Sequence, residues 1–235
     1  MNSKKESLKF KRHFLTIPFF KKKKRFLTFI MALFTIALLI HPYPLLAAWF
    51  GFFIAGYSAI ANDSIQTIGT FISSNSHRKW WVLWLFISTI FFLTVLYSWI
   101  SFNGDVSHQR LIAKGFEESP TSFHFLQIAA PIFLLILTRA KMPVSTTFLL
   151  LSSFATTGTA IGKVLFKSVG GYFLSFIIAF VIYLFISKIS KRLFVGTPSK
   201  GWSVAQWIVS GTLWSIWLQQ DAANIAVFLP RSLSG

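Results

Sequence analysis

Two of the six acidic residues, Asp63 and Asp221, lie within or at the edge of long apolar runs. Each occupies a frame of amide, acid, two small or apolar residues, and amide: Asn62-Asp63-Ser64-Ile65-Gln66 and Gln220-Asp221-Ala222-Ala223-Asn224. An ionised carboxylate in the core of a bilayer costs at least about 2.5–3.5 kcal/mol, so an intramembrane acid marks a functional site by default. Two copies of the frame predict a duplicated site for an ion or a substrate.

The first frame lies in a polar stretch, residues 61–70, that is polar enough to interrupt a helix. Its carboxylate and amide oxygens are hard ligands of the kind that small cations accept. The hydroxyls of Thr67 and Thr70 can donate hydrogen bonds to an anion. The competing interpretation is an ordinary cytoplasmic helix end with Asp63 as its cap, which the polar residues 73–75 favour.

A second stretch, residues 141–147, combines a proline with three hydroxyls. Pro143 suits the first position of a helix, where its missing N–H costs nothing. The residues after it present free backbone N–H groups at a positive helix end, together with the hydroxyls of Ser145, Thr146 and Thr147. The stretch therefore predicts an anion site, and an ordinary N-terminal cap beside a basic interface is the alternative.

The composition is that of an integral membrane protein. The chain is 54% hydrophobic and 12% charged, with 28 Phe and 9 Trp among 235 residues, whereas a soluble domain is about 25% charged. It has no cysteine, which excludes disulfides, thiolate metal sites and a cysteine nucleophile. No two histidines have ligand spacing and no glycine-rich nucleotide loop occurs. We therefore expect no metal or cofactor beyond a coupling Na+ or H+, no enzymatic activity and no ATP-driven pumping.

The N-terminal tail is strongly basic. The formal net charge is +17, and ten of the 23 Lys and Arg residues lie in residues 1–25. Positive charge at the end of an apolar span fixes orientation in a membrane and attracts anionic lipid. We interpret the tail as a cytoplasmic anchor and do not expect nucleic acid as a partner. Apolar character resumes after Pro44, which favours an uncleaved first helix over a cleaved signal peptide.

Apolar runs of about 20 residues are candidates for membrane spans. The chain has seven such runs, at residues 26–41, 45–61, 80–102, 123–140, 143–162, 168–187 and 202–219. With the N-terminus in the cytoplasm, seven crossings put 18 of the 23 Lys and Arg residues inside, in agreement with the positive-inside rule. The run at 143–162 could instead enter the membrane and return, but the charge distribution favours a crossing, by a continuous or a broken helix.

In this topology the segments that carry Asp63 and Asp221 run in opposite directions. One motif on antiparallel segments is the signature of an inverted repeat, and such transporters bind substrate and coupling ion near the bilayer midplane on interrupted helices. We therefore expect an all-α protein of about seven transmembrane helices, some interrupted, in the plasma or inner membrane. Its parts would be a basic tail (1–25), a first repeat (26–187), a basic cytoplasmic loop (188–201) and the start of an inverted second repeat (202–235).

These stretches together resemble the inorganic phosphate transporter (PiT) family of cation-coupled permeases. The family has Asn-Asp-x-x-Asn and then Gly-Thr in its first half, Pro-Val-Ser-Thr-Thr-His after an apolar span, and a second Asn-Asp-x-x-Asn in its second half. The matching residues here are Asn62, Asp63, Gly69 and Thr70, then Pro143-Val144-Ser145-Thr146-Thr147, then Asp221 and Asn224. The resemblance covers residues 45–230 and keeps the order of the three motifs.

The chain also departs from the family. Gln66 and Gln220 stand in place of Asn, Phe148 stands in place of His, and the Gly-Pro expected after the second signature is missing. The chain ends at Gly235, before the remaining spans of the family's second half. We therefore expect a complete first repeat and a partial second one, and the resemblance supports the fold more strongly than it supports phosphate specificity.

The resemblance implies symport of inorganic phosphate, or a similar oxyanion, with Na+ or H+. It implies that six side chains bind the coupling ion, two carboxylates and four amides: Asp63, Asp221, Asn62, Gln66, Gln220 and Asn224. It implies that four hydroxyls bind the oxyanion: Thr70, Ser145, Thr146 and Thr147. Whether the chain forms a homo-oligomer is left open.

Three other functions remain as alternatives. An intramembrane aspartyl hydrolase also needs two aspartates that share a proton, but its Tyr-Asp and Gly-x-Gly-Asp signatures do not surround Asp63 or Asp221. A truncated or divergent membrane protein of the same fold would not transport. A permease for another oxyanion, such as sulfate, would use the same hydroxyl donors.

Overall fold

The computed structural model describes residues 24–116, 118–140, 142, 144–155, 158–193 and 199–230, and all regular elements in these residues are helices. The labelled helices are α2 (Pro44–Thr67), α3 (Gly69–Ser74), α4 (Trp80–Ser101), α5 (Arg110–Ala113), α6 (Phe125–Arg139), α7 (Thr146–Ser152), α8 (Gly158–Leu193) and α9 (Lys200–Ala226). A further helix at residues 24–40 precedes α2. The expected all-helical class is confirmed, whereas most of the basic tail (residues 1–23), Pro143 and residues 231–235 lie outside the described residues.

Among the residues that the structure describes, three helices are long and apolar enough to cross a membrane: the segments Pro44–Ser64 of α2, Trp80–Ser101 of α4 and Ser168–Ser190 of α8. α6 is apolar but has only 15 residues, which is about 22 Å at 1.5 Å per residue and less than a hydrocarbon core of about 30 Å. These helices support a membrane protein. The α8 segment has the highest mean hydropathy, yet none of it is buried within the chain, so its apolar side chains are open to lipid.

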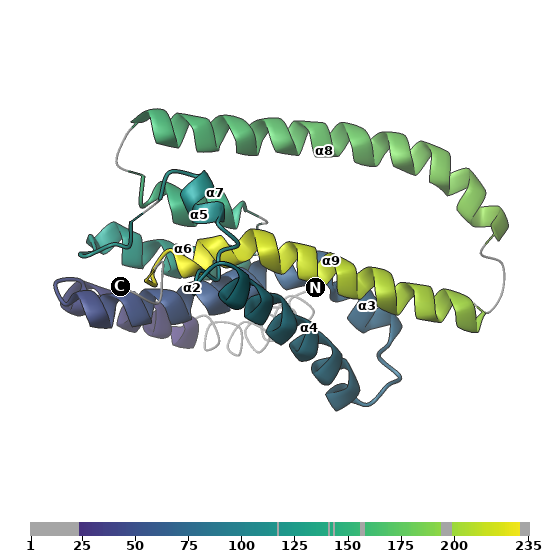
Figure 1. Cartoon of the computed structure of the whole chain (residues 1–235), viewed down its shortest axis with the longest axis horizontal. Helices are drawn as coiled ribbons and strands as arrows, with labels where there is room; N and C mark the ends of the chain where they lie inside the picture. Colours follow the sequence, from purple (N-terminus) through teal and green to yellow (C-terminus); the bar gives the residue numbers. More distant parts are fainter. Residues whose placement is uncertain are drawn as a thin grey trace, which may run out of the picture.

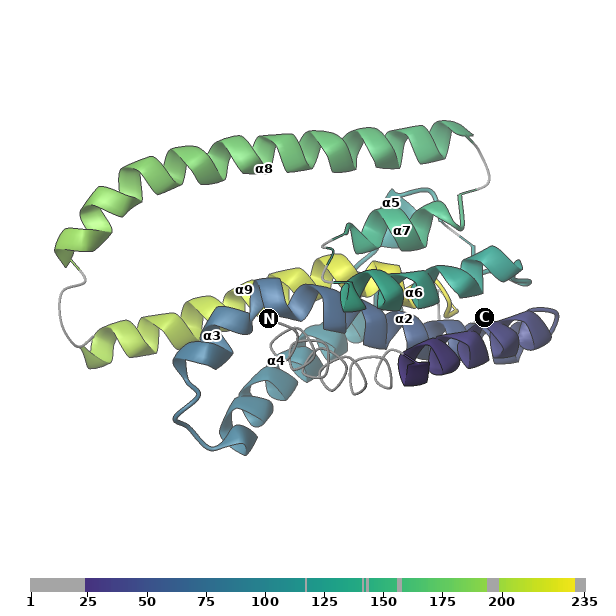
Figure 2. The same cartoon turned by 180° about the vertical axis from the view of Figure 1, so that it is seen from behind.

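α2 and α9 lie side by side and run in opposite directions (Figures 1 and 2). α6 and α7 both contact α2, and their buried apolar residues form the main core together with the end of α9. Phe228, just after α9, stacks on Phe123 with ring centroids 6.0 Å apart and meets Phe154 edge-on at 5.1 Å. The same ring lies over Gly51, where a Cβ would be 2.3 Å from it. Glycine at this position therefore lets α2 approach the end of α9.

α6 and α7 run in opposite directions and are joined by a short connection. α6 begins near the turn before α2, where the ring centroids of Phe125 and His41 are 6.5 Å apart, and it ends beside Asn62. α7 leads back toward the first side, because Phe154 just after it packs on Phe228. The two helices therefore form a hairpin whose turn lies deep along α2.

The run at residues 143–162, which was expected to cross the membrane, is broken rather than a single helix. It divides into α7, a turn that includes residues 153–155, and the start of α8. The Ser153 hydroxyl donates to the Leu150 carbonyl at 2.6 Å where α7 ends. α8 in turn continues through residues 188–193, which the sequence placed in a loop, because no proline interrupts it.

The helix that carries Asp63 is interrupted within the polar stretch 61–70, as expected, but only after the frame. α2 continues to Thr67 and turns only at Ile68. The Thr67 hydroxyl donates to the Asp63 carbonyl oxygen at 3.1 Å, so this polar side chain is satisfied without breaking the backbone ladder. α9 likewise extends beyond the apolar run at 202–219 and includes Asp221.

α4 is attached to α9 by polar contacts. The hydroxyl oxygens of Thr94 and Ser215 are 2.9 Å apart, and the Trp214 indole N–H donates to the Ile87 carbonyl at 3.2 Å. α9 is thus held against both α4 and α2. This packing fixes the position of its C-terminal third, which carries the second frame.

Candidate functional site

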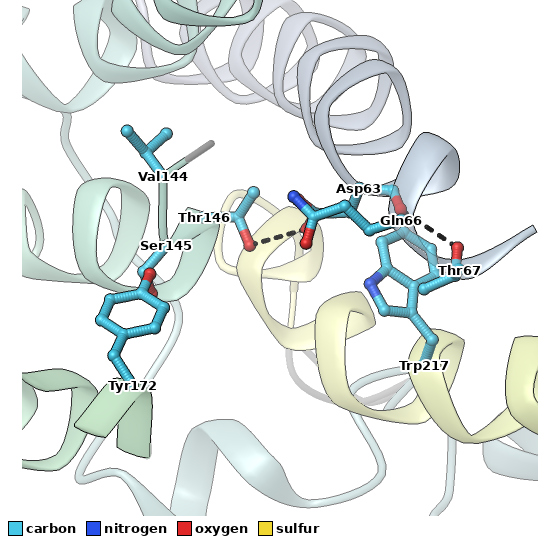
Figure 3. Close-up of a pocket in the computed structure, with 8 residues that line it drawn as sticks. All are labelled: Asp63, Gln66, Thr67, Val144, Ser145, Thr146, Tyr172 and Trp217. Carbon is cyan, nitrogen blue, oxygen red and sulfur yellow. Dashed lines mark hydrogen bonds between the residues drawn. The ribbon is translucent and has the colours of Figure 1, made fainter. Parts of the chain in front are cut away.

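The side chain of Thr146, the first residue of α7, lies between the two aspartates. Its hydroxyl oxygen is 2.8 Å from Asp221 Oδ1 and 3.2 Å from Asp63 Oδ2. Figure 3 shows Thr146 bonded to Asp63, and Thr67 bonded to the same residue from the following turn of α2. The start of α7 therefore brings together one carboxylate from each of the two antiparallel helices.

The two carboxylates share one hydroxyl group. A threonine hydroxyl has a single hydrogen and donates to one carboxylate at a time, yet both Asp63 and Asp221 lie at hydrogen-bond distance from it. Two ionised carboxylates so close together repel each other, and a proton on one of them or a bound cation relieves the repulsion. The geometry therefore favours binding of positive charge at this point.

Asn224 orients the Thr146 hydroxyl. Its side chain is fully buried, and Nδ2 is 3.2 Å from the Thr146 hydroxyl oxygen and 3.0 Å from that of Thr147. The same Nδ2 is in close contact with Asp221 Oδ1, one turn earlier on α9. Because the Thr146 oxygen accepts from Asn224, its own hydrogen is directed to the carboxylates. The second frame and the hydroxyl stretch are therefore one connected group.

Three buried oxygens of the two frames accept no hydrogen bond from the described part of the chain: Asn62 Oδ1, Asp221 Oδ2 and Asn224 Oδ1. The side chain of Asn62 forms its one hydrogen bond within the described residues through Nδ2, which donates to the Thr138 hydroxyl at 2.9 Å. A buried acceptor without a donor costs free energy, about 1–3 kcal/mol. Such oxygens commonly bind cations or ordered water molecules.

A cavity of about 200 Å³ opens beside Asp63 and Thr146 (Figure 3). Its lining residues come from α2, the start of α7, α8 and α9: Asp63, Gln66, Thr67, Val144, Ser145, Thr146, Tyr172 and Trp217. Pockets for drug-sized ligands measure about 300–1,000 Å³. The cavity is smaller than these and matches a small ion or oxyanion better than an organic molecule.

The structure does not bring every expected site residue to this cavity. Thr70 lies on α3 and Gln220 on α9, and both side chains are exposed away from the lining. Gln66 is also exposed, but it contributes to the cavity wall. Ser145 is the N-cap of α7 and accepts from the Phe148 N–H at 3.1 Å, so its hydroxyl hydrogen remains available to a ligand.

Three kinds of residue at or near the site were missed at the sequence level. Thr138 holds Asn62 in place, and Tyr172 and Trp217 line the cavity. None of the three belongs to a motif, and their roles depend on which helices face each other. No local signal in the sequence would have identified them.

The third missed group is basic. α5, which begins at Arg110, packs against α9, and Arg110 Nε and Lys114 Nζ are both buried. The two cations lie four residues apart and outside every motif stretch, so no motif marked them.

The turn that leads into α5 is held in place by Asp105. Its buried carboxylate accepts from the Ser107 N–H at 2.7 Å and from the Gln109 N–H at 2.9 Å. Asn103, His108 and Gln109 have positive φ angles, a conformation that is costly for residues other than glycine. Burial of the His108 ring lowers the pKa of His108 below its ordinary value, against the opposing charge of Asp105. The turn is thus an ordered structure that leads into α5, which packs on α9.

Comparison with protein-family models, with curated proteins and with solved structures found no match to this chain. Among the residues that the structure describes, no three His, Asp or Glu side chains gather as a metal site. The two frames, their shared hydroxyl and the cavity are therefore the basis for a function.

Proposed function

We propose that the chain is a multi-pass membrane transporter that moves an oxyanion such as inorganic phosphate together with a cation, Na+ or H+. The observation that carries the proposal is the position of the Thr146 hydroxyl, between the carboxylates of Asp63 and Asp221 on antiparallel helices. The three motif stretches of the PiT-like pattern, separated by up to 158 positions in the sequence, lie together at this point. Antiparallel elements that meet around buried acids are typical of inverted-repeat transporters.

In this mechanism the cation binds first at the carboxylates. Na+ between Asp63 and Asp221, or a proton on one of them, cancels the repulsion between the two carboxylates. It also gives Asp221 Oδ2 the partner that this oxygen lacks. The oxyanion then enters the cavity and accepts from the Ser145 hydroxyl, while the cation offsets the charge of the carboxylates. Transport of one ion without the other would leave uncompensated charge in a low-dielectric site, which is the origin of the coupling.

We further propose a topology of five crossings and one re-entrant hairpin in place of seven crossings. The helix at 24–40, α2, α4, α8 and α9 would cross, and α6 and α7 would enter and return on the outer side. The short α6 and the opposite directions of α6 and α7 support this assignment. It keeps the basic ends at Lys79, Lys188 and Lys200 together on the cytoplasmic side.

Uptake of labelled phosphate into proteoliposomes tests the function. We expect uptake that depends on an inward Na+ or H+ gradient. Asp63→Asn and Asp221→Asn should each reduce it at least about tenfold, the equivalent of one lost charged contact. Glu118→Gln is the matched control, because it makes the same acid-to-amide change on an exposed residue of the loop.

The outcomes separate the alternatives. Uptake of sulfate in place of phosphate would keep the mechanism and change the substrate. No flux of either anion under any gradient would remove the transport function and leave a non-transporting membrane protein. Unchanged uptake and unchanged cation dependence in Asp63→Asn would exclude the assigned role of the carboxylate.

A further inference from the structure

The cavity beside Thr146 has a single charged side chain among the described residues that line it, that of Asp63. No lysine or arginine is among these described lining residues. An anion that enters is repelled by the carboxylate and must be held by neutral O–H and N–H donors. The hydrogen bonds that the lining side chains already make show which of these donors are available.

Two of the four lining hydroxyls are already engaged. The Thr67 hydroxyl donates to the Asp63 carbonyl oxygen at 3.1 Å, and the Thr146 hydroxyl lies within hydrogen-bond distance of both aspartates. A hydroxyl has one hydrogen, so neither group has a hydrogen left for an anion. The Ser145 oxygen only accepts a backbone N–H, and the Tyr172 hydroxyl forms no hydrogen bond with the described residues. The hydrogens of Ser145 and Tyr172 are therefore available.

The two available hydroxyls come from the same part of the cavity wall. In the view of Figure 3, Ser145 and Tyr172 lie on one side of the lining group, and Asp63 lies on the other side with Gln66 and Trp217. An anion held by the hydroxyl pair is thus kept away from the carboxylate. A cation bound at the aspartates would attract this anion across the cavity, because opposite charges in a low-dielectric site interact strongly.

Tyr172 reaches the cavity from α8, whose segment Ser168–Ser190 is otherwise unburied within the chain. α8 packs on α7, the helix that begins directly after Ser145. Tyrosine suits this boundary, since its ring is apolar and its tip is polar. A hydroxyl that faces hydrocarbon without a partner costs free energy. The polar cavity is therefore the favourable place for the tip of this side chain.

We propose that the hydroxyl of Tyr172 is an anion-binding group of the cavity, and that it holds a tetrahedral oxyanion together with the hydroxyl of Ser145. The inference rests on the proposed transport function and adds to it a residue that none of the three motif stretches contains. The oxyanion accepts one hydrogen bond from each hydroxyl. The bound anion then connects α8 with the start of α7, so α8 is part of the site and not only a helix that faces lipid.

Tyr172→Phe removes the hydroxyl and keeps the ring. Tyr183→Phe is the matched control, because it makes the same change on the same helix at an exposed residue outside the cavity lining. The thermal midpoint of protein purified in a lipid-free detergent is followed while inorganic phosphate is titrated at fixed Na+ concentration and pH. We expect the half-saturating phosphate concentration to rise about tenfold in Tyr172→Phe, the effect of one lost hydrogen bond to a charged group, and to stay unchanged in the control.

A second titration separates an anion contact from a structural role. The response to Na+ without phosphate should be the same in Tyr172→Phe as in the wild type, because both aspartates are unchanged. Altered responses to Na+ and to phosphate together would indicate disturbed packing and overturn the proposal. An unchanged phosphate response in Tyr172→Phe would also overturn it, and would leave Tyr172 as an interfacial aromatic residue of a lipid-facing helix.

Uptake of labelled phosphate into proteoliposomes distinguishes failure of this inference from failure of transport. If phosphate stabilises the wild type more than Tyr172→Phe although no uptake occurs, the anion contact stands and transport fails. If uptake occurs with the same half-saturating phosphate concentration in both proteins, transport stands and the role of Tyr172 is excluded. If no concentration of phosphate stabilises the wild type, the anion site itself is excluded.

A lipid headgroup offers the same phosphate chemistry as the free ion. The titration is therefore repeated in nanodiscs of phosphatidylcholine with and without phosphatidylglycerol. We expect the response to free phosphate to persist in both. Stabilisation by phosphatidylglycerol that is lost in Tyr172→Phe, without any response to free phosphate, would assign the hydroxyl to a lipid headgroup and overturn the substrate role.

Discussion

At the scale of single residues, Thr146 is the point on which the site depends. Its hydroxyl accepts from Asn224 and lies within hydrogen-bond distance of Asp63 and Asp221. Replacing this hydroxyl by a methyl group therefore removes a hydrogen-bond partner from both carboxylates at once.

Thr146→Val should abolish coupled uptake and destabilise the protein by about 1–3 kcal/mol, because the valine keeps the shape but leaves buried polar groups without their partner. Thr146→Ser retains the hydroxyl and should retain uptake. Thr212→Val is the control on exposed α9 surface, where the hydroxyl only returns to the Ile208 carbonyl. Initial uptake rate and the thermal midpoint are measured for all three. Full coupled uptake in Thr146→Val would show that the shared hydroxyl is dispensable.

Part of the site could be predicted at this scale, and part could not. The repeated frames pointed to Asp63 and Asp221, and the hydroxyl stretch pointed to Thr146, all of which lie together. Thr70 belongs to the same pattern but lies outside the cavity lining. A motif fixes which side chains are present, whereas the direction of each side chain depends on helix rotation, which the neighbouring helices decide.

At the scale of elements, the close approach of α2 to the end of α9 depends on a glycine. A Cβ at Gly51 would lie 2.3 Å from the buried Phe228 ring. Gly51→Ala should therefore destabilise the protein by about 1–3 kcal/mol through overpacking. Gly56→Ala is the matched control on the same helix, since its nearest contact, Ile225 Cγ2, would be an ordinary 3.7 Å.

The control should be neutral or stabilising by about 0.5–1 kcal/mol, because alanine is the better helix former. Thermal or denaturant unfolding in detergent measures both variants. Equal stability of Gly51→Ala and Gly56→Ala would contradict the packing of Phe228 described here.

The turn before α5 should respond to acid through His108. Burial lowers the pKa of His108, so the folded state favours the neutral ring. This contribution to stability is complete above the unfolded pKa of about 6.5 and is lost as the pH falls from there through the lower folded value. Between pH 7.5 and 5.5, wild type should therefore lose more stability than His108→Asn, in which asparagine tolerates the positive φ. Identical pH profiles of the two proteins would contradict the burial of this ring.

Sequence patterns predicted the elements unevenly. The long apolar run that became α4 was predicted nearly to its ends, because uniform hydrophobicity leaves few alternatives. The break expected in residues 61–70 falls at Ile68, after the frame that carries Asp63. The run at 143–162, expected as one span, divides into α7 and the start of α8.

At the scale of the whole molecule, α2 and α9 run in opposite directions past the site, and α8 lies along one side (Figure 1). The all-helical class and the membrane-span candidates followed from composition alone. The hairpin of α6 and α7 did not, because a 15-residue apolar helix has the composition of a span without its length. The packing of α5 on α9 also depends on tertiary contacts that no hydropathy profile contains.

The proposed topology predicts which positions face the cytoplasm. The chain has no cysteine, so single cysteines can be introduced directly at exposed positions. Ser199→Cys and His77→Cys should react with a membrane-impermeant maleimide only from the cytoplasmic side, and Glu118→Cys only from the opposite side. Labelling of Ser199→Cys and Glu118→Cys from the same side would contradict the five-crossing arrangement.

The most direct test of the central claim is a double-mutant cycle on Asp63→Asn and Asp221→Asn, measured as the initial rate of cation-driven phosphate uptake above protein-free liposomes. Two carboxylates that bind one cation act as a unit, so their losses should not add. We predict that the double variant loses no more activity than the worse single variant. Losses that multiply, as they do for independent residues, would contradict a single site shared by the two aspartates.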